Sequence, residues 1–357
     1  MKSLAFYLGD SIRTFFRRPE VRRSVLDVVN TRPPIGVEFI TENNAPVEES
    51  VSIDASYQKD IFTYNSQLSV YQITGRTFFD VSRIRLNVWG NNEGITPRIK
   101  EVKIKGTEFT STYEPFDSDN WNFNNCSALE KITMSDEVKY IGFPSNSYTG
   151  ASISIEDCPT FQAIEGNNLV YIQDIQYRLN NYVVTEDHLD LTGLIPAHTT
   201  VGSLSVELFY APEQSGTVLV KSPGCTLDEL YINNQWGGNV LMDVDVSQTK
   251  FTYREYFDVN EGTALTLPVR LQTLTVDTEA KEMPYSISFG YSETIDWESI
   301  ETFVQLLVDL DGTNGTTLWN GQLYMSELPP VPEGIAALLE ELITRGAETV
   351  TYTPPTI

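Results

Sequence analysis

The sequence predicts a mainly β fold in which successive turns of chain stack on one another as a solenoid. Each of the three cysteines, Cys126, Cys158 and Cys225, opens a similar phrase in which large apolar residues follow at fixed offsets. In the first phrase these apolar residues are Leu129, Ile132 and Met134. Because side chains alternate across a strand, this spacing turns one turn residue and two strand residues inward. The 18 tyrosines and 17 phenylalanines also favour strands.

The 357 residues could hold two or three domains, but a solenoid uses its length for stacked coils that share one core. We therefore expect one elongated body with an appended N-terminal piece. The predicted divisions are a basic amphipathic helical anchor at 1–34, a β-rich module or first irregular coils at 35–94, a repeat solenoid at 95–290 and a helix–strand–helix cap at 291–357.

The N-terminal anchor has apolar residues at helical spacing and an excess of positive charge. Residues 1–32 contain seven basic and three acidic residues, whereas the remainder contains 17 basic and 46 acidic residues. We expect docking through Arg13, Phe16, Arg17, Arg18, Arg22 and Arg23. Packing on the chain's own body, docking onto an acidic neighbouring subunit and binding to a membrane surface remain open. Asp10 interrupts the apolar stretch, which argues against a secretory signal and a membrane span.

Alternating apolar residues predict strands at 51–54, 68–73 and 84–88. Further along, the apolar phrase recurs without cysteine at 99–104 and 271–276. Shorter strand fragments occur at 153–155, 189–191 and 204–206. The copies are unevenly spaced, so the coils must differ in length, and residues 167–201 fit no unit cleanly.

The phrase from Cys126 to Met134, continued by Val138 to Gly142, resembles the BspA-like leucine-rich repeats of bacterial surface proteins and of some phage virion proteins. Units of that family read Cys-x-x-Leu-x-x-Ile-x-Ile, then a turn and Val-x-x-Ile. The third copy departs from this pattern by one residue between Cys225 and Leu227. The resemblance extends over roughly residues 95 to 352.

The last sixty residues resemble the segment that closes such repeats. Helical spacing predicts a helix that contains Trp297, Ile300, Val304 and Leu307. A turn at 309–312 and a last strand at 316–319 follow. A final helix is expected to start near Pro332, to bury Ile335, Leu339 and Leu342, and to end at Arg345-Gly346.

The three thiols are expected to be free, buried and stacked at matching positions in separate coils, as fits a reducing cytoplasm. A disulfide would require two coils to bring their Cα atoms within about 7 Å of each other. The formal charge of -25 weighs against nucleic-acid binding, which needs a basic face. This charge suits a component of a soluble particle.

The sequence contains no catalytic motif. The two histidines, His188 and His198, lack metal-site spacing, and the turn at 309–315 lacks the ligands of a calcium loop. We therefore predict no enzyme, no catalytic residue, no metal site and no cofactor. The predicted contact residues are aromatic and amide side chains near strand ends. They are Trp89, Asn91, Trp121, Tyr231, Asn233, Gln235 and Trp236.

The resemblance and the missing export signal together favour a structural or host-recognition protein of a tailed-phage virion, in its tail, baseplate or capsid. Such a protein is assembled in the host cytoplasm. Its expected partners are other virion subunits in a larger assembly and a host surface protein or glycan. A bacterial BspA-like adhesin and a carbohydrate-processing tail enzyme are the alternatives.

Overall fold

The fold is mainly β, with parallel pairing in its sheets. The computed structural model describes residues 36–41, 51–55, 62–65, 70–73, 84–89, 99–105, 121–136, 138–141, 152–180, 188–211, 213–234, 239–254 and 262–356. The expected N-terminal anchor, with all six docking residues, lies outside the described residues.

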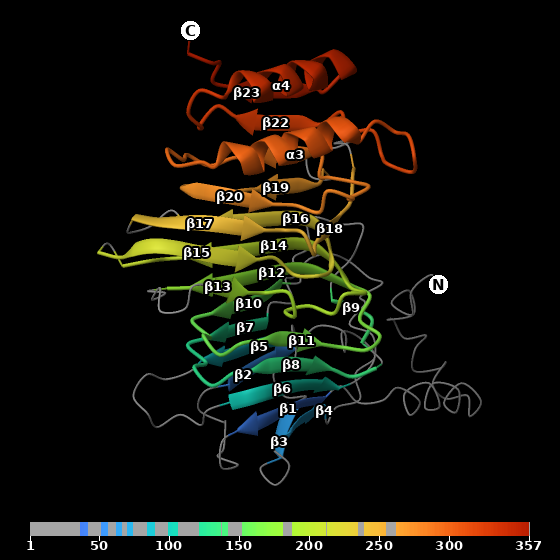
Figure 1. The fold of residues 1–357 in the computed structure, drawn as a ribbon. Coiled ribbons are helices and arrows are strands. Elements are labelled where there is room, and N and C mark those ends of the chain that lie inside the picture. The colour runs from blue at the N-terminus through green and yellow to red at the C-terminus, as the bar shows by residue number, and fades with distance from the viewer. Residues whose placement is uncertain are drawn as a thin grey trace, which may run out of the picture.

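The longest sheet has 13 strands and forms one layer of the molecule (Figure 1). Its main path is, in order, β2 (Val51–Ala55), β5 (Ile84–Trp89), β7 (Trp121–Asn124), β10 (Ser152–Glu156), β12 (Tyr171–Leu179), β14 (Thr200–Leu208), β16 (Thr226–Asn233), β19 (Ala264–Thr266), β21 (Ser286–Ser288), β22 (Gln322–Met325) and β23 (Thr349–Tyr352). The short strands β9 (Tyr140–Ile141) and β18 (Lys250–Phe251) pair with β12 and β16. From β5 to β23 every neighbouring pair on this path is parallel.

The second layer consists of two shorter sheets. The first has the order β11 (Ala163–Glu165), β8 (Lys131–Met134), β6 (Ile99–Lys105), β1 (Gly36–Thr41), β4 (Val70–Ile73) and β3 (Phe62–Asn65). The second has the order β13 (His188–Asp190), β15 (Ser215–Lys221), β17 (Asn239–Asp245) and β20 (Leu271–Thr275). Helix α3 (Trp297–Asp309) packs beside β20, and α4 (Glu333–Arg345) packs on α3, so the helices continue this layer.

The chain alternates between the two layers, and we call one strand of the long sheet with the second-layer element that follows it a circuit. Successive circuits are β7 with β8, β10 with β11, β12 with β13, β14 with β15, β16 with β17, β19 with β20, β21 with α3 and β22 with α4. Parallel pairing in the long sheet places each circuit directly against the next, as Figure 1 shows.

Alternation within each strand builds the core between the layers. One inward position is occupied by an apolar residue in eight successive strands, and each of these residues is at most 2% exposed. In register order they are Trp121, Ile153, Ile175, Leu204, Leu230, Leu265, Ile287 and Leu323. The predicted inward residues of the first cysteine phrase, Leu129, Ile132 and Met134, are buried as well.

All three cysteines are buried and free, as predicted, but only two of them occupy matching positions. Cys126 and Cys158 follow β7 and β10, where the chain leaves the long sheet. Cys225 instead precedes β16, where the chain enters this sheet. The expectation of three equivalent thiols is therefore wrong for Cys225. Strand register places Cys225 at the opposite turn of its circuit, just before the β16 pairing that starts at Thr226.

The irregular stretch 167–201 coincides with a break in the second layer. The six-stranded sheet ends at β11, and the four-stranded sheet begins at β13, while the long sheet continues unbroken through β12 and β14. Strands are also present at the three places predicted before residue 95. Strand β5 pairs in parallel with β7, and β6 pairs in parallel with β8, so these early strands extend the same sheets.

Both C-terminal helices lie where the apolar spacing predicts them. Asp296 accepts the first-turn N–H groups of α3, and α4 ends at Gly346, whose φ of 99° is the left-handed conformation that glycine tolerates. The strand predicted at 316–319 is absent, because its backbone bonds to turns instead: Thr317 N donates to Lys281 O and Trp319 N to Leu310 O, both at 2.9 Å. The buried Trp319 also donates its indole N–H to the Pro284 carbonyl. Pairing with β21 begins only at Gln322, in β22.

Candidate functional site

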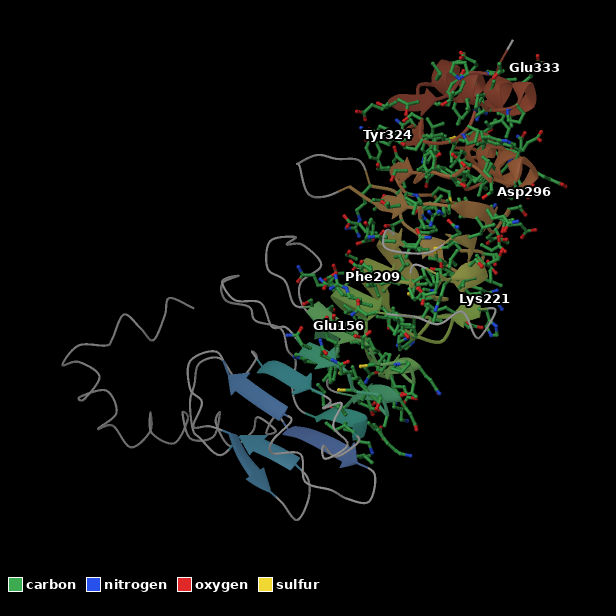
Figure 2. All side chains as sticks on the ribbon, turned by 90° about the vertical axis from the view of Figure 1, so that its left-hand side faces the viewer. Glu156, Phe209, Lys221, Asp296, Tyr324 and Glu333 are labelled. Carbon is green, nitrogen blue, oxygen red and sulfur yellow. The ribbon has the colours of Figure 1, made fainter. Side chains whose placement is uncertain are left out.

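The long sheet presents a polar outer face on the side opposite the core. We define the outer face as the outward side chains of β7, β10, β12, β14, β16, β19, β21, β22 and β23. Figure 2 shows Glu156 and Tyr324 on this side of the stack and Lys221 and Asp296 on the other side. Most outer-face residues are half-buried, because neighbours in a parallel sheet partly cover one another.

A row of uncharged hydroxyl and amide side chains crosses the middle of the outer face. Strand register places nine residues side by side in this row: Asn122, Ser154, Gln176, Ser205, Tyr231, Thr266, Ser288, Tyr324 and Thr351. No charged residue occurs among them. Because the strands fix the spacing, such a row offers hydrogen-bonding groups at regular intervals with little entropy left to lose on binding.

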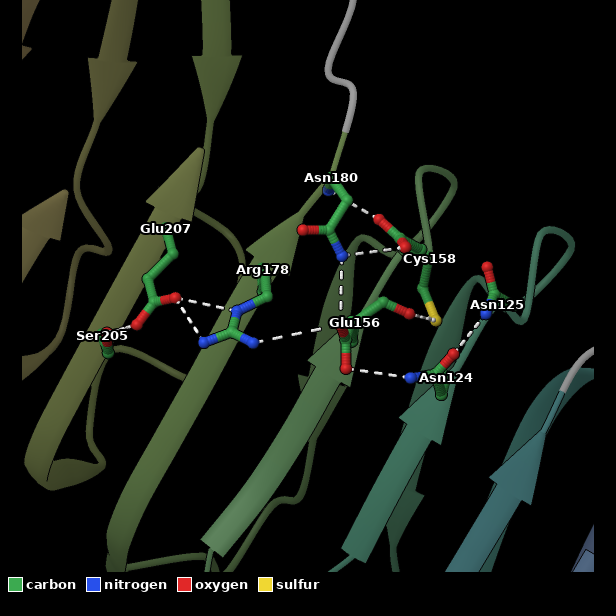
Figure 3. Close-up of polar contacts among 9 residues, drawn as sticks. Asn124, Asn125, Glu156, Cys158, Arg178, Asn180, Ser205 and Glu207 are labelled. Carbon is green, nitrogen blue, oxygen red and sulfur yellow. Dashed lines mark hydrogen bonds and ion pairs between the residues drawn. The ribbon is translucent and has the colours of Figure 1, made fainter. Parts of the chain in front are cut away.

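A second row, nearer the strand ends, is charged and internally hydrogen-bonded (Figure 3). Its members in register order are Asn124, Glu156, Arg178, Glu207 and Asn233. Arg178 donates to one Glu207 oxygen from Nε at 2.8 Å and from NH2 at 2.6 Å, and it stacks on the Phe209 ring at 5.5 Å. The Glu156 carboxylate accepts Asn124 Nδ2 at 2.8 Å on its other side.

A third group lies where the alternation of buried and outward side chains is interrupted in β12, β14 and β16. Consecutive inward residues are three positions apart there, as Leu227 and Leu230 of β16 are, whereas elsewhere in these strands they are two positions apart. Asp174 and Glu229 point outward there beside the buried Asp228, which accepts Thr252 Oγ1 at 2.7 Å and pairs with Arg254 at 3.3 Å.

Burial raises the pKa values of the titratable side chains in this third group. Burial raises the pKa of Asp174, although hydrogen bonds from Gln176 and Ser203 oppose the shift. Burial, then repulsion from Asp228 and Asp174, raises the pKa of Glu229. Burial, followed by the Asp228 charge, also raises the pKa of Tyr171 to about 12.

The raised carboxyl pKa values predict a stability cost at neutral pH. A carboxyl group whose pKa is higher in the folded state holds its proton there more tightly than in the unfolded chain. The free energy of unfolding therefore falls as pH rises above the ordinary values of 3.8 for Asp174 and 4.5 for Glu229.

We expect Glu229→Gln to raise the free energy of unfolding at pH 7 by about 0.5 kcal/mol. The gain should shrink near pH 4, as measured by urea denaturation at both pH values. An equal gain at both would contradict the assignment, and Glu213→Gln, at an exposed site, serves as the control.

The structure brings two of the seven predicted contact residues together. Tyr231 and Asn233 both lie on the outer face, two positions apart on β16. Trp89 belongs to β5, in register with Asn124, and its side chain is not described. Asn91, Gln235 and Trp236 lie outside the described residues.

The prediction that Trp121 is a contact residue is wrong. Its side chain is 2% exposed and occupies the first position of the apolar core row, so it cannot serve as a surface contact. The burial pattern of β7 turns Trp121 and Phe123 inward and the neighbouring Asn122 and Asn124 outward. The tryptophan was chosen for its residue type, whereas strand alternation determines which side chain is exposed.

Most of the outer face, including Gln176, Arg178, Ser205 and Glu207, was not predicted from the sequence. A signal for these residues was present, because polar residues alternate with buried ones through β12 and β14. Finding it required the strand boundaries, which the short apolar fragments indicated only in part.

A shallow cleft of 350 Å³ lies apart from this face, along α3, with Glu298, Glu301, Asp309 and Leu306 among its lining residues. Within the described ranges, no three His, Cys, Asp or Glu side chains are grouped as a metal site. Neither described helix is long and apolar enough to cross a bilayer. Comparison with family models, with curated proteins and with solved structures found no match to this chain.

Proposed function

We propose that the chain is a leucine-rich-repeat-like solenoid of the BspA-like kind, closed at its C-terminal end by two helices. Three observations support this proposal: the alternation of the chain between two layers, the apolar row shared by eight successive strands, and the placement of α3 beside β20. The helices take the positions of second-layer strands in the last circuits, as a cap would.

We further propose that the protein is a non-enzymatic structural and recognition component of a tailed-phage virion. The basic segment before residue 35 docks it to an acidic neighbouring subunit, and the outer face contacts a protein or a host-surface glycan. The continuous middle row of nine uncharged polar side chains carries this proposal, because the backbone orders it and it presents hydrogen-bonding groups at regular intervals. The resemblance of the repeat phrases to virion proteins supports the location.

The docking step predicts a loss of the chain from particles. Arg17→Glu with Arg18→Glu reverses two charges, so particles purified from the encoding strain should contain roughly tenfold less of the chain. Lys139→Glu with Lys250→Glu makes the same charge change on the exposed surface of the body and should leave incorporation normal. Mass spectrometry of purified particles measures both variants. Absence of the unaltered chain from particles would instead favour the adhesin alternative.

The recognition step predicts a different defect. Ser205→Arg with Thr266→Arg inserts bulk and charge into the middle row, and we expect normal incorporation but roughly tenfold weaker adsorption of particles to host cells. Thr217→Arg with Thr273→Arg makes the matched change on the second layer and should not affect adsorption. If the two double variants behave alike, the outer face is not the recognition surface. Hydrolysis of host polysaccharide by the purified protein would support the enzyme alternative.

A further inference from the structure

Two of the three buried thiols occupy equivalent positions in adjacent circuits. Asn124 of β7 and Glu156 of β10 are register partners, and each is followed by a residue with a left-handed backbone and then by a cysteine. The left-handed residues are Asn125, with φ 54°, and Asp157, with φ 52°. The turns continue alike, since Leu129 N donates to Cys126 O and Phe161 N donates to Cys158 O, both at 3.0 Å.

The sulfur atoms of Cys126 and Cys158 both lie near backbone carbonyl groups at the end of β7. Cys126 Sγ lies 3.5 Å from the carbonyl oxygen of Asn124. Cys158 Sγ lies 3.4 Å from the carbonyl oxygen of Glu156 in its own circuit and 3.6 Å from that of Phe123 in the neighbouring circuit, so it lies between the two circuits. The proximity of the Cys126 thiol also raises the pKa of Cys158. Figure 3 shows Cys158 at this turn, beside the charged row.

The spacing between the circuits matches the geometry of a disulfide. Neighbouring strands in a sheet are about 4.8 Å apart, and the Cα atoms of a disulfide are usually about 4.4 to 6.8 Å apart. The pairing continues one residue past the two strands, where Asn125 N donates to Glu156 O at 2.9 Å. We therefore expect the Cα atoms of Cys126 and Cys158 to meet this distance requirement. Cys225 lies at the opposite turn of its circuit, in a different part of the stack, and cannot compete for either partner.

We propose that Cys126 and Cys158 form an oxidant-closed cross-link site that staples the β7–β8 circuit to the β10–β11 circuit. The staple is open in a reducing cytoplasm and closes when the protein meets an oxidising environment. This inference does not depend on the proposed virion function, because it rests only on the register and contacts of the two circuits.

The chemistry needs one two-electron oxidant, and a peroxide supplies it. Cys126, which is 5% exposed against 0% for Cys158, attacks the peroxide oxygen as the thiolate. This step forms a sulfenic acid and releases one water. The Cys158 sulfur then attacks the sulfenic sulfur, the S–S bond forms, and the hydroxyl leaves as a second water with the thiol proton. Two thiols are thereby oxidised and one peroxide is reduced to two waters.

The surroundings make this reaction slow and selective. The hydrogen bond with Cys126 and then burial raise the pKa of Cys158, and burial raises the pKa of Cys225 to about 12. The Cys158 thiolate is therefore scarce at neutral pH, and bulky disulfides such as oxidised glutathione reach the buried pair poorly. Small oxidants are the expected agents, and local opening of the turn should accelerate closure.

The test uses the full chain, purified with a reductant and then exposed to hydrogen peroxide in buffer and in urea below the unfolding midpoint. We expect the count of free thiols to fall from three to one, with one peptide pair joining Cys126 to Cys158. Closure should raise the melting temperature by about 5 °C, because the cross-link restricts the unfolded chain. A reductant should reverse both changes.

Matched variants separate the staple from general oxidation. Cys225→Ser should still close and still gain thermal stability, whereas Cys158→Ser should do neither. Peptide mapping of the unaltered protein gives an answer even if a variant fails to fold. Three free thiols after prolonged exposure to peroxide in urea below the unfolding midpoint, a disulfide that includes Cys225, or a melting temperature that does not rise on closure would each overturn the proposal.

Discussion

Replacing Leu204 by alanine is expected to lower the free energy of unfolding by about 2 to 5 kcal/mol. Leu204 is fully buried in the middle of β14, and its register partners on either side are Ile175 and Leu230, both also buried. Truncation leaves a cavity that rigid neighbours above and below cannot fill, since the strand spacing fixes their positions. Urea denaturation followed by far-ultraviolet circular dichroism measures the loss.

The adjacent residue supplies the control for this prediction. Ser205 points to the outer face from the same strand, so Ser205→Ala should change the free energy of unfolding by less than about 0.5 kcal/mol. Similar losses of unfolding free energy for the two variants would mean that Leu204 and Ser205 do not lie on opposite faces of β14, one buried and one solvent-facing. The stacked arrangement of circuits would then be incorrect at its centre.

Short-range patterns in the sequence predict much of this fold. The offsets after Cys126 identify the buried residues of β8, and helical spacing with Gly346 identifies α4 and its end. These features depend on nearest-neighbour rules of alternation and capping, which can be read without knowing the rest of the chain. The uneven spacing of the phrase copies also predicts that the circuits differ in length, and the strand positions agree.

Features that depend on contacts between circuits were harder to predict. Cys225 has the right neighbours in sequence but lies at the other turn, because equivalence between circuits is determined by strand register. Trp319 fits a strand phrase, yet the Pro284 carbonyl and the core beneath α3 hold it in irregular chain. Strand β23 was not predicted at all, since its pairing with β22 requires α4 to return the chain to the sheet.

The candidate site was found only in part, for the same reason. Tyr231 and Asn233 were selected because aromatic and amide residues suit binding. Their row partners, such as Ser205 and Glu207, have unremarkable residue types and become a surface only when register aligns them. No single residue of such a face indicates binding by its type. The face can be recognised only after strand register aligns its residues into rows.

Introducing a methyl group at Gly321 is expected to destabilise the C-terminal end of the stack by about 3 kcal/mol. A Cβ atom at this position would lie 2.0 Å from the Tyr285 carbonyl oxygen and 2.8 Å from its carbon. Backbone atoms cannot rotate away as a side chain can, so Gly321→Ala must push the start of β22 off β21. The Gly321 carbonyl also accepts the Glu348 N–H at 3.0 Å, which carries the strain toward β23.

Gly334 provides the matched comparison, since it is an exposed glycine in the first turn of α4 with only a side-chain oxygen of Glu301 near its missing Cβ. Alanine favours the helical backbone, so Gly334→Ala should stabilise the protein by up to about 1 kcal/mol. Urea denaturation combined with limited proteolysis distinguishes the variants, because Gly321→Ala should expose cleavage sites in 326–356 before the central circuits open. Equal stability of the two variants would show that β22 does not approach β21 as closely as described. The two helices would then be attached to the stack less firmly than a closing segment requires.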